Sequence, residues 1–230
     1  MDALPRQNSL LESVYEAVRE SICDGDLKPG ERITQEAIAE KLDVSRQPVN
    51  QALILLRAQG FIQDAGRRGV MVTPLTPEFV QDIYEIRSAL DQLAARLAVL
   101  RGDRKGIAEG FRLVEDVQGR LQTASTGELV KADMRFHELV YRMSGNDLIQ
   151  SSLTPYWHHL RRVMAAVIDE AIRRERIWRE HEEILGAIDA GNADLAAARA
   201  AAHVDTASKT LTASLAARSP AAIGQGDQAP

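Results

Sequence analysis

The chain has 230 residues, of which 45% are hydrophobic and 27% charged, and this composition is typical of a folded globular protein. The formal net charge of −5 excludes a uniformly basic nucleic-acid coat but allows a local basic patch. The single cysteine, Cys23, excludes an intrachain disulfide framework and is interpreted as structural. Because no signal peptide or stretch of ~20 apolar residues is visible, we expect a cytoplasmic protein with no membrane partner.

Three short helices are predicted in the first sixty residues. The first begins after the capping residue Ser9 and ends near Gly25. The second begins after Thr34, and the third runs from Ser45 to about Gln59. Their apolar spacing predicts inward-facing side chains at Leu10, Val14, Val18, Ile22, Ile38, Leu42, Val49, Leu53 and Leu56.

Two β-prone runs, residues 61–62 and 70–73, follow the third helix. They flank a segment in which Gly66 and Gly69 supply the backbone freedom that a hairpin tip needs. Three helices and a hairpin describe a winged helix-turn-helix, whose recognition helix enters the major groove of DNA. We therefore predict a mainly α protein with this motif in an N-terminal domain, residues 8–73.

Candidate DNA contacts gather at the start of the predicted recognition helix and at the hairpin tip. Arginine pairs well with guanine, and glutamine or asparagine with adenine, because each makes two hydrogen bonds to one base edge. Arginines on the hairpin suit phosphates or the narrow minor groove. The alternative is that these residues form an ordinary basic surface, exposed to solvent, that contacts no DNA. The candidates are Ser45, Arg46, Gln47, Asn50, Arg67 and Arg68.

A proline-rich linker at residues 74–77 separates this region from a longer helical one. Residues 78–215 are predicted to form an all-α six-helix bundle, and residues 216–230 a disordered tail. In the first helix the predicted inward stripe is Ile83, Ile86, Leu90, Leu93 and Leu97. The six predicted helices span residues 77–101, 104–122, 126–144, 147–168, 171–190 and 193–215.

Three of the five histidines fall at inward positions of three different predicted helices. His137 lies four residues after Asp133, so both point to one helix face. His181 shares a stripe with isoleucines, and His203 shares one with alanines. One carboxylate and three imidazoles would suit a zinc-like divalent ion with room for an exchangeable ligand. The alternative for each histidine is a hydrogen-bonded core residue.

Residues 10–73 carry a series of short motifs: GDLKPG at 25–30, IAEKL at 38–42, VSRQPV at 44–49 and RGV at 68–70. This series resembles the GntR family of bacterial transcription regulators. The resemblance implies DNA contacts by Arg46, Arg67, Arg68 and Gly69. The chain departs from the family at Asn50-Gln51, where Arg-Glu is usual, so we expect its operator to differ from the family's commonest one.

Further motifs follow in the helical region: DMRFH at 133–137, SGN at 144–146, Glu180-His181 and the later His203. They resemble the FadR-type ligand-binding domain called FCD, and six helices point to its VanR-like branch. The resemblance implies a small carboxylate effector beside a divalent metal, zinc first, with nickel, manganese or iron as alternatives. The implied metal ligands are Asp133, His137, His181 and His203.

A further motif lies in the first helix of this region, YEIR at 84–87 followed by Leu90-Asp91. It is similar to the Arg-x-x-Leu-Glu motif of the family, with aspartate in place of glutamate. Arg87 is thus a candidate contact to the effector, because a guanidinium matches the two oxygens of a carboxylate. The alternative is a salt bridge from Arg87 to Asp91.

These observations together predict a ligand-responsive transcription regulator. Because loss of DNA binding on ligand binding is the commoner behaviour in the family, we expect a repressor. It is expected to bind a palindromic operator in double-stranded DNA as a homodimer. A metal sensor would use the same four ligands and is one alternative. A metal-dependent enzyme is another, but Glu138 and Glu182 directly follow ligand histidines and should point away from the metal, so no general base is apparent and we expect no enzyme activity.

Overall fold

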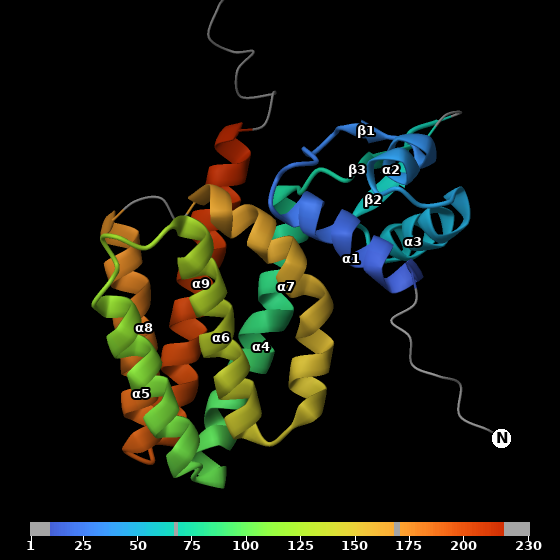
Figure 1. Ribbon diagram of the computed structural model, residues 1–230. Helices are drawn as coiled ribbons and strands as arrows, with labels where there is room; N and C mark the ends of the chain where they lie inside the picture. The colour runs from blue at the N-terminus through green and yellow to red at the C-terminus, as the bar shows by residue number, and fades with distance from the viewer. Residues whose placement is uncertain (1–9, 67–68, 168–170, 219–230) are drawn as a thin grey trace, which may run out of the picture. The chain divides into compact units, whose positions relative to one another are not determined.

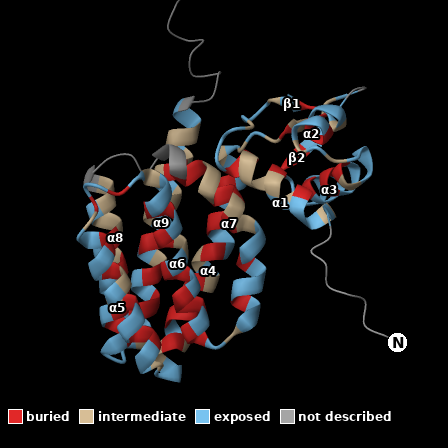
Figure 2. Ribbon diagram, in the orientation of Figure 1, coloured by how far each residue is buried: buried red, intermediate tan, exposed pale blue. Residues whose placement is uncertain are grey.

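The computed structural model describes residues 10–66, 69–167 and 171–218, and within them the chain forms nine α-helices and three short strands (Figure 1). The chain divides into two compact units, residues 1–75 and 76–230. Buried residues gather inside each unit (Figure 2). The expected mainly α fold, a winged helix-turn-helix followed by a helical bundle, is confirmed. Among the helices described, none has the length and apolar content needed to cross a membrane.

The three helices of the first unit lie where the sequence predicts them. They are α1 (Leu10–Cys23), α2 (Gln35–Lys41) and α3 (Arg46–Ala58). The Thr34 side chain accepts a hydrogen bond from the Ala37 amide and caps α2 as expected. Ser45 has the extended backbone of a capping residue, but its side chain makes no capping hydrogen bond. The predicted cap of α1, Ser9, lies outside the described residues.

The wing is a three-stranded antiparallel sheet, one strand more than the sequence predicts. Its strands are β1 (Arg32–Ile33), β2 (Ile62–Asp64) and β3 (Val70–Val72), in the order β1-β3-β2. A two-residue strand such as β1 carries no alternation of polar and apolar residues that could reveal it. It forms because Ile33 pairs with Val70 and buries its side chain.

The core of the first unit follows the predicted pattern with one exception. Leu10, the first residue of α1, is 53% exposed. Leu42 is only partly buried. Cys23 is buried in this core, in keeping with a structural role. The other predicted positions are buried: Val14, Val18, Ile22, Ile38, Val49, Leu53 and Leu56.

The second unit contains the six expected helices, with small shifts at their ends. α5 ends at residue 118 rather than 122, and α9 continues beyond 215 to 218. The rest of the predicted tail lies outside the described residues. The helices are α4 (Pro77–Arg101), α5 (Arg104–Gln118), α6 (Thr126–Ser144), α7 (Asp147–Val167), α8 (Ala171–Asp189) and α9 (Ala193–Arg218).

The inward face of α4 differs from the predicted one. Ile86 is 47% exposed and Leu93 is 41% exposed, whereas the charged Arg87 and Asp91 are buried. α4 packs mainly against α9 and α6. The face it presents to them combines these two charges with small side chains, which allow close helix packing. The buried residues of α4 are Val80, Ile83, Tyr84, Arg87, Asp91, Ala94, Ala95 and Ala98.

Candidate functional site

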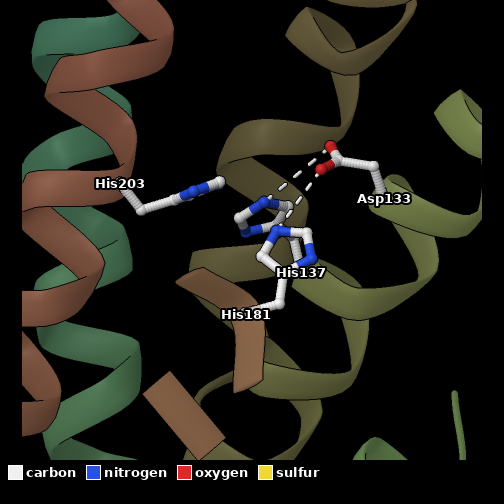
Figure 3. A group of neighbouring side chains, drawn as sticks. All are labelled: Asp133, His137, His181 and His203. Atoms are coloured by element: carbon white, nitrogen blue, oxygen red, sulfur yellow. Dashed lines mark ion pairs between the residues drawn. The ribbon is translucent and has the colours of Figure 1, made fainter. Parts of the chain in front are cut away.

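Four polar side chains converge inside the helical unit (Figure 3). Asp133 and His137 come from α6, His181 from α8 and His203 from α9. Each offers one potential ligand atom, and these atoms all lie within 4.8 Å of one another. All four side chains are buried, so the bundle brings together the complete set that the sequence singles out.

The position of α6 is determined by strong signals at both of its ends. Ser125 and Glu128 form a capping box at its start, and Gly145 ends it in the left-handed conformation with φ of 60°. On this helix Asp133 Oδ2 lies 3.9 Å from His137 Nε2. The other carboxylate oxygen lies 3.4 Å from His181 Nε2 of α8. The aspartate therefore faces two imidazoles at once.

His181 supplies the test of whether this cluster fits a metal ion. Its side chain is fully buried, and neither ring nitrogen has a hydrogen-bond partner among the described residues. Phe136 stacks on the ring at 3.8 Å between centroids, and Trp178 meets it edge-on at 4.9 Å. A buried polar atom without a partner costs about 1–3 kcal/mol. A divalent ion bound to one ring nitrogen would supply a partner, so the residues fit a metal.

Carboxylates outside the cluster lie beside two of its histidines. His203 Nδ1 lies 2.8 Å from Glu180 Oε2, and His137 Nδ1 lies 3.4 Å from Asp91 Oδ2. A carboxylate at Nδ1 favours the tautomer with the proton on that nitrogen, which leaves Nε2 free to bind a metal. This pattern is the usual surrounding of metal-binding histidines.

Arg87 lies at the edge of the cluster and makes two kinds of contact. Its Nε lies 3.3 Å from Asp91 Oδ2, so the salt bridge weighed as an alternative is present. Its Nη2 also lies 2.6 Å from His137 Nε2, and the guanidinium stacks 4.4 Å from the Trp157 ring. Because arginine only donates, His137 Nε2 is the acceptor. Arg87 thus contacts a potential metal ligand as well as its expected partner.

Burial shifts the pKa values of the ionisable groups in this centre. It lowers the pKa of His137 and of His181 well below the ordinary value, so both rings are neutral and able to bind a metal at neutral pH. It raises the pKa of Asp133, an effect partly offset by Arg87. Burial also opposes the charged form of Arg87, but Asp91, Tyr84, Tyr141 and Asp133 together outweigh it and the pKa of Arg87 is raised.

A small cavity of about 40 Å³ opens beside the cluster and is lined by Asp133, His203 and Arg87. A volume of this size holds a few water molecules. Two arginines of α8, Arg173 and Arg176, also line it. The sequence analysis did not single them out, because nothing in the spacing of α8 distinguishes them from its other arginines.

Glu180 is a third residue that the sequence analysis did not assign to the site. It precedes His181, and neighbouring helix residues point in different directions. Glu180 nevertheless reaches His203 on α9, a contact that only the packing of two helices creates. Glu138 and Glu182, by contrast, are exposed, as expected from their places directly after His137 and His181.

The candidate DNA contacts of α3 are accessible. Arg46 lies 3.3 Å from Glu36 of α2, and both side chains are largely exposed. Gly69 has φ of 86°, and a Cβ there would lie 2.9 Å from the Ile33 carbonyl oxygen, so the wing requires glycine at this position. Arg67 and Arg68 lie outside the described residues. The exposed candidates at the start of α3 are Ser45, Arg46, Gln47 and Asn50.

A winged helix-turn-helix joined to a helical unit with a buried polar centre defines the class of two-domain transcription regulators. Residues 3–72 match the bacterial regulatory proteins of the gntR family, and residues 82–206 match the FCD domain. The chain therefore belongs to the GntR family of transcription regulators, in the group that carries an FCD domain. It is a regulator and not an enzyme.

Relatives and solved structures agree with this assignment. The uncharacterised HTH-type transcriptional regulator YdhC of Bacillus subtilis is 30% identical over 82% of this chain and 85% of its own. The HTH-type transcriptional regulator LutR of the same organism is 27% identical over 83% of this chain and 96% of its own. The solved structure of Escherichia coli McbR/YncC shares the fold, with a TM-score of 0.75 and 20% identity over 90% of this chain and 98% of its own.

Proposed function

We propose that this regulator is a repressor whose affinity for a palindromic operator is controlled by a small carboxylate, bound at a divalent metal in the helical unit. The metal ligands would be Asp133, His137, His181 and His203. The observation that carries the proposal is the contact between Arg87 and His137, next to a small cavity that Arg87 and Asp133 both line.

The hydrogen bond from Arg87 is incompatible with a metal on the same nitrogen. His137 Nε2 has one lone pair, which either the Arg87 N–H group or a metal ion can use. When that lone pair binds a metal, the buried N–H of Arg87 needs a new acceptor. A carboxylate at the metal would supply this acceptor, since Arg87 lines the same cavity.

The balance of buried charge also favours an anionic effector. The buried charged side chains of the centre are one positive, Arg87, and two negative, Asp91 and Asp133, whereas Glu180 beside His203 is 22% exposed and remains in contact with solvent. A divalent cation would leave one positive charge in excess in a buried site, where uncompensated charge is costly. One carboxylate would neutralise the excess. We assign zinc as the metal because three imidazoles and one carboxylate are ligands that it prefers, with nickel, manganese or iron as alternatives.

DNA binding is assigned to residues 8–73, with residues 74–77 as the linker and 78–215 as the effector domain. The recognition helix would be α3, which presents Ser45, Arg46, Gln47 and Asn50 to base edges. Arg67, Arg68 and Gly69 of the wing are proposed as contacts to phosphates or the minor groove. A protein that binds chromosomal DNA in a bacterium acts in the cytoplasm.

The homodimer proposal is supported by an apolar stripe on the exposed side of α4. We call Phe79, Ile86, Leu93 and Leu100 the α4 stripe; they are 36%, 47%, 41% and 70% exposed. Their spacing of seven residues, with the half-buried Leu90 and Leu97 between them, is the heptad pattern of helices that pair. A second copy of the chain would cover the stripe about a two-fold axis, matching a palindromic operator.

Control by the effector would be a shift in population. The metal-bound carboxylate would favour one arrangement of the α4–α9 helices, and the linker would transmit the difference to the DNA-binding units. We propose that effector binding releases the regulator from DNA. The size of the effect is limited by the difference in effector affinity between the two arrangements.

The test uses fluorescence anisotropy to measure how tightly the zinc-loaded protein binds the DNA upstream of its own coding region. The measurement is repeated at several salt concentrations. We expect sequence-preferring binding that weakens steeply with salt, as phosphate contacts require. Acetate and other small carboxylates should then lower the affinity only when the protein carries its metal. Binding no tighter than to random DNA would contradict the operator proposal, and release by the metal alone would identify a metal sensor instead.

A further inference from the structure

The first residue of α3 forms an ion pair with an acidic residue of the neighbouring helix. Arg46 Nη1 lies 3.3 Å from Glu36 Oε1 of α2, and the two side chains are 68% and 58% exposed. Exposed ion pairs of this kind contribute little to stability. A carboxylate also repels the phosphates of DNA. Neither stability nor affinity for the DNA backbone therefore explains why Glu36 lies on this surface.

Local contacts place the two side chains next to each other. The Thr34 side chain accepts a hydrogen bond from the Ala37 amide and so caps the first turn of α2, in which Glu36 lies. The side-chain amide of Gln35 donates a hydrogen bond to the backbone carbonyl of Arg46, which joins the start of α2 to the start of α3. The position of the pair is therefore determined by the junction of two helices.

Glu36 borders the same groove as the exposed side of α3. An open groove of about 660 Å³ lies in the first unit, between the start of α2, α3 and the wing. Its lining includes Glu36, Asn50, Ile54 and Gly69. A recognition helix meets base edges with its first residues. Because Glu36 contacts the first residue of α3, a base edge that Arg46 reaches also comes within reach of Glu36.

The pair offers donors beside an acceptor, which is the pattern that one G·C base pair needs. In the major groove guanine presents the acceptors N7 and O6, and the paired cytosine presents its N4 amino group as a donor. O6 and N4 lie about 2.9 Å apart, because they are hydrogen-bonded to each other. The 3.3 Å between Arg46 Nη1 and Glu36 Oε1 is close to this spacing. A guanidinium has five N–H groups, so Arg46 can bind guanine and Glu36 at the same time.

We propose that Glu36 accepts a hydrogen bond from the cytosine whose paired guanine is bound by Arg46, so that the two side chains read both strands of one G·C pair. An A·T pair in its place would present the O4 acceptor of thymine to the carboxylate, which has no donor for it. This inference rests on the proposed function, because it takes Arg46 as a contact to base edges. It adds a residue of α2 to those that determine the operator sequence.

The test replaces the cytosines of the bound upstream DNA, one at a time, by N4-methylcytosine. This base still pairs with guanine, but a methyl group takes the place of the N–H exposed in the major groove. At one cytosine of each half-site the full-length wild type should lose affinity about tenfold or more, as expected for a hydrogen bond to a charged acceptor. Glu36→Ala should bind the methylated and unmethylated DNA equally. Asp64→Ala, which removes the acidic partner of the other arginine of α3, should keep the wild-type loss.

A second comparison checks that both side chains read the same base pair. Exchange of this G·C pair for A·T should weaken binding by the wild type much more than binding by Arg46→Ala, and circular dichroism shows that each variant is folded. A loss on methylation that survives Glu36→Ala, that falls at another base pair, or that is found at no cytosine would overturn the inference while the operator proposal stands. Binding to the upstream DNA no tighter than to random DNA would contradict both.

Discussion

The charged residues at the centre of the helical unit are buried far beyond what is usual for their type. Arg87 is 1% exposed, Asp91 3% and Asp133 4%, whereas such side chains are rarely buried unless they are paired. Arg87 and Asp91 pair with each other, and Tyr141 donates a hydrogen bond to Asp91 at 2.5 Å. His181 is the member of this centre whose ring nitrogens have no hydrogen-bond partner in the described part of the chain, so it is the most informative residue to change.

His181→Ala removes one proposed metal ligand and leaves a small void in place of the ring. We expect zinc affinity to fall by more than the 10–100-fold that changes around a metal site usually cost, because a direct ligand is lost. Metal content after dialysis, measured by atomic emission, checks this expectation. His158→Ala, outside the cluster, should retain its metal, and full metal content in a folded His181→Ala protein would contradict the proposed centre.

Arg46→Ala tests the recognition helix. Loss of a two-bonded contact to a base should weaken operator binding by roughly 1–3 kcal/mol, or about 5- to 150-fold, and relax the base preference at one position. Anisotropy with the operator and with single-base variants measures both effects. Arg112→Ala, an exposed arginine of α5, is the matched control. Equal operator affinity for the wild type and Arg46→Ala would remove Arg46 from the interface.

At the scale of an element, α5 shows how small residues bring helices together around the site. A Cβ on Gly106 would lie 2.5 Å from Met143 Cγ and 2.6 Å from the carboxylate of Asp103, which caps the helix. A Cβ on Gly110 would lie 2.8 Å from Leu185. These two glycines, one turn apart, allow α5 to pack closely against α6 and α8, the helices that carry three of the proposed ligands.

Gly106→Ala should therefore destabilise the helical unit despite alanine's higher helix propensity. Overpacking costs about 1–3 kcal/mol against a gain of at most ~1 kcal/mol, so we expect the free energy of unfolding to fall by about 1–2 kcal/mol. Both tryptophans, Trp157 and Trp178, lie in this unit, so their fluorescence during urea unfolding reports on it. Gly186→Ala, with open space around the position, should instead raise stability by up to about 1 kcal/mol.

At the scale of the whole molecule, the α4 stripe is the feature that favours a second copy of the chain. Scattered exposed hydrophobic residues are ordinary, but four of them spaced by seven along one helix form a continuous seam. In the proposed function, α4 would therefore have two functional faces. One carries Arg87 to the cavity, and a neighbouring one would join two protomers, so the effector would act on the helix that holds the dimer together.

Leu93→Glu should separate the protomers, because it would place a charge in the middle of an apolar interface. We expect the dimer dissociation constant to rise by roughly 30-fold or more, equivalent to about 2 kcal/mol. Sedimentation equilibrium over a range of protein concentrations measures this change. Leu148→Glu alters a leucine of α7 that is 74% exposed, away from the stripe, and should leave the association unchanged. A Leu93→Glu protein as dimeric as the wild type would place the interface elsewhere.

Local sequence signals determined much of this protein. Caps such as Thr34, turn glycines and apolar spacing predicted nine helices and the wing hairpin, because each signal acts within a few residues. The spacing of Asp133 and His137 placed them on one face for the same reason. The strand β1 escaped notice, since a two-residue strand exists only through its pairing with β3.

Tertiary structure alone decided which face of α4 is buried. The leucines and isoleucines on its outer side recur with the same helical period as the residues of a core face would. Periodicity alone therefore cannot distinguish a core face from a subunit interface. The burial of Arg87 and Asp91 depends on partners from α6, and the contact of Glu180 with His203 depends on the packing of α8 against α9. Such pairs join residues far apart in the chain, and only the folded bundle brings their charges within reach of one another.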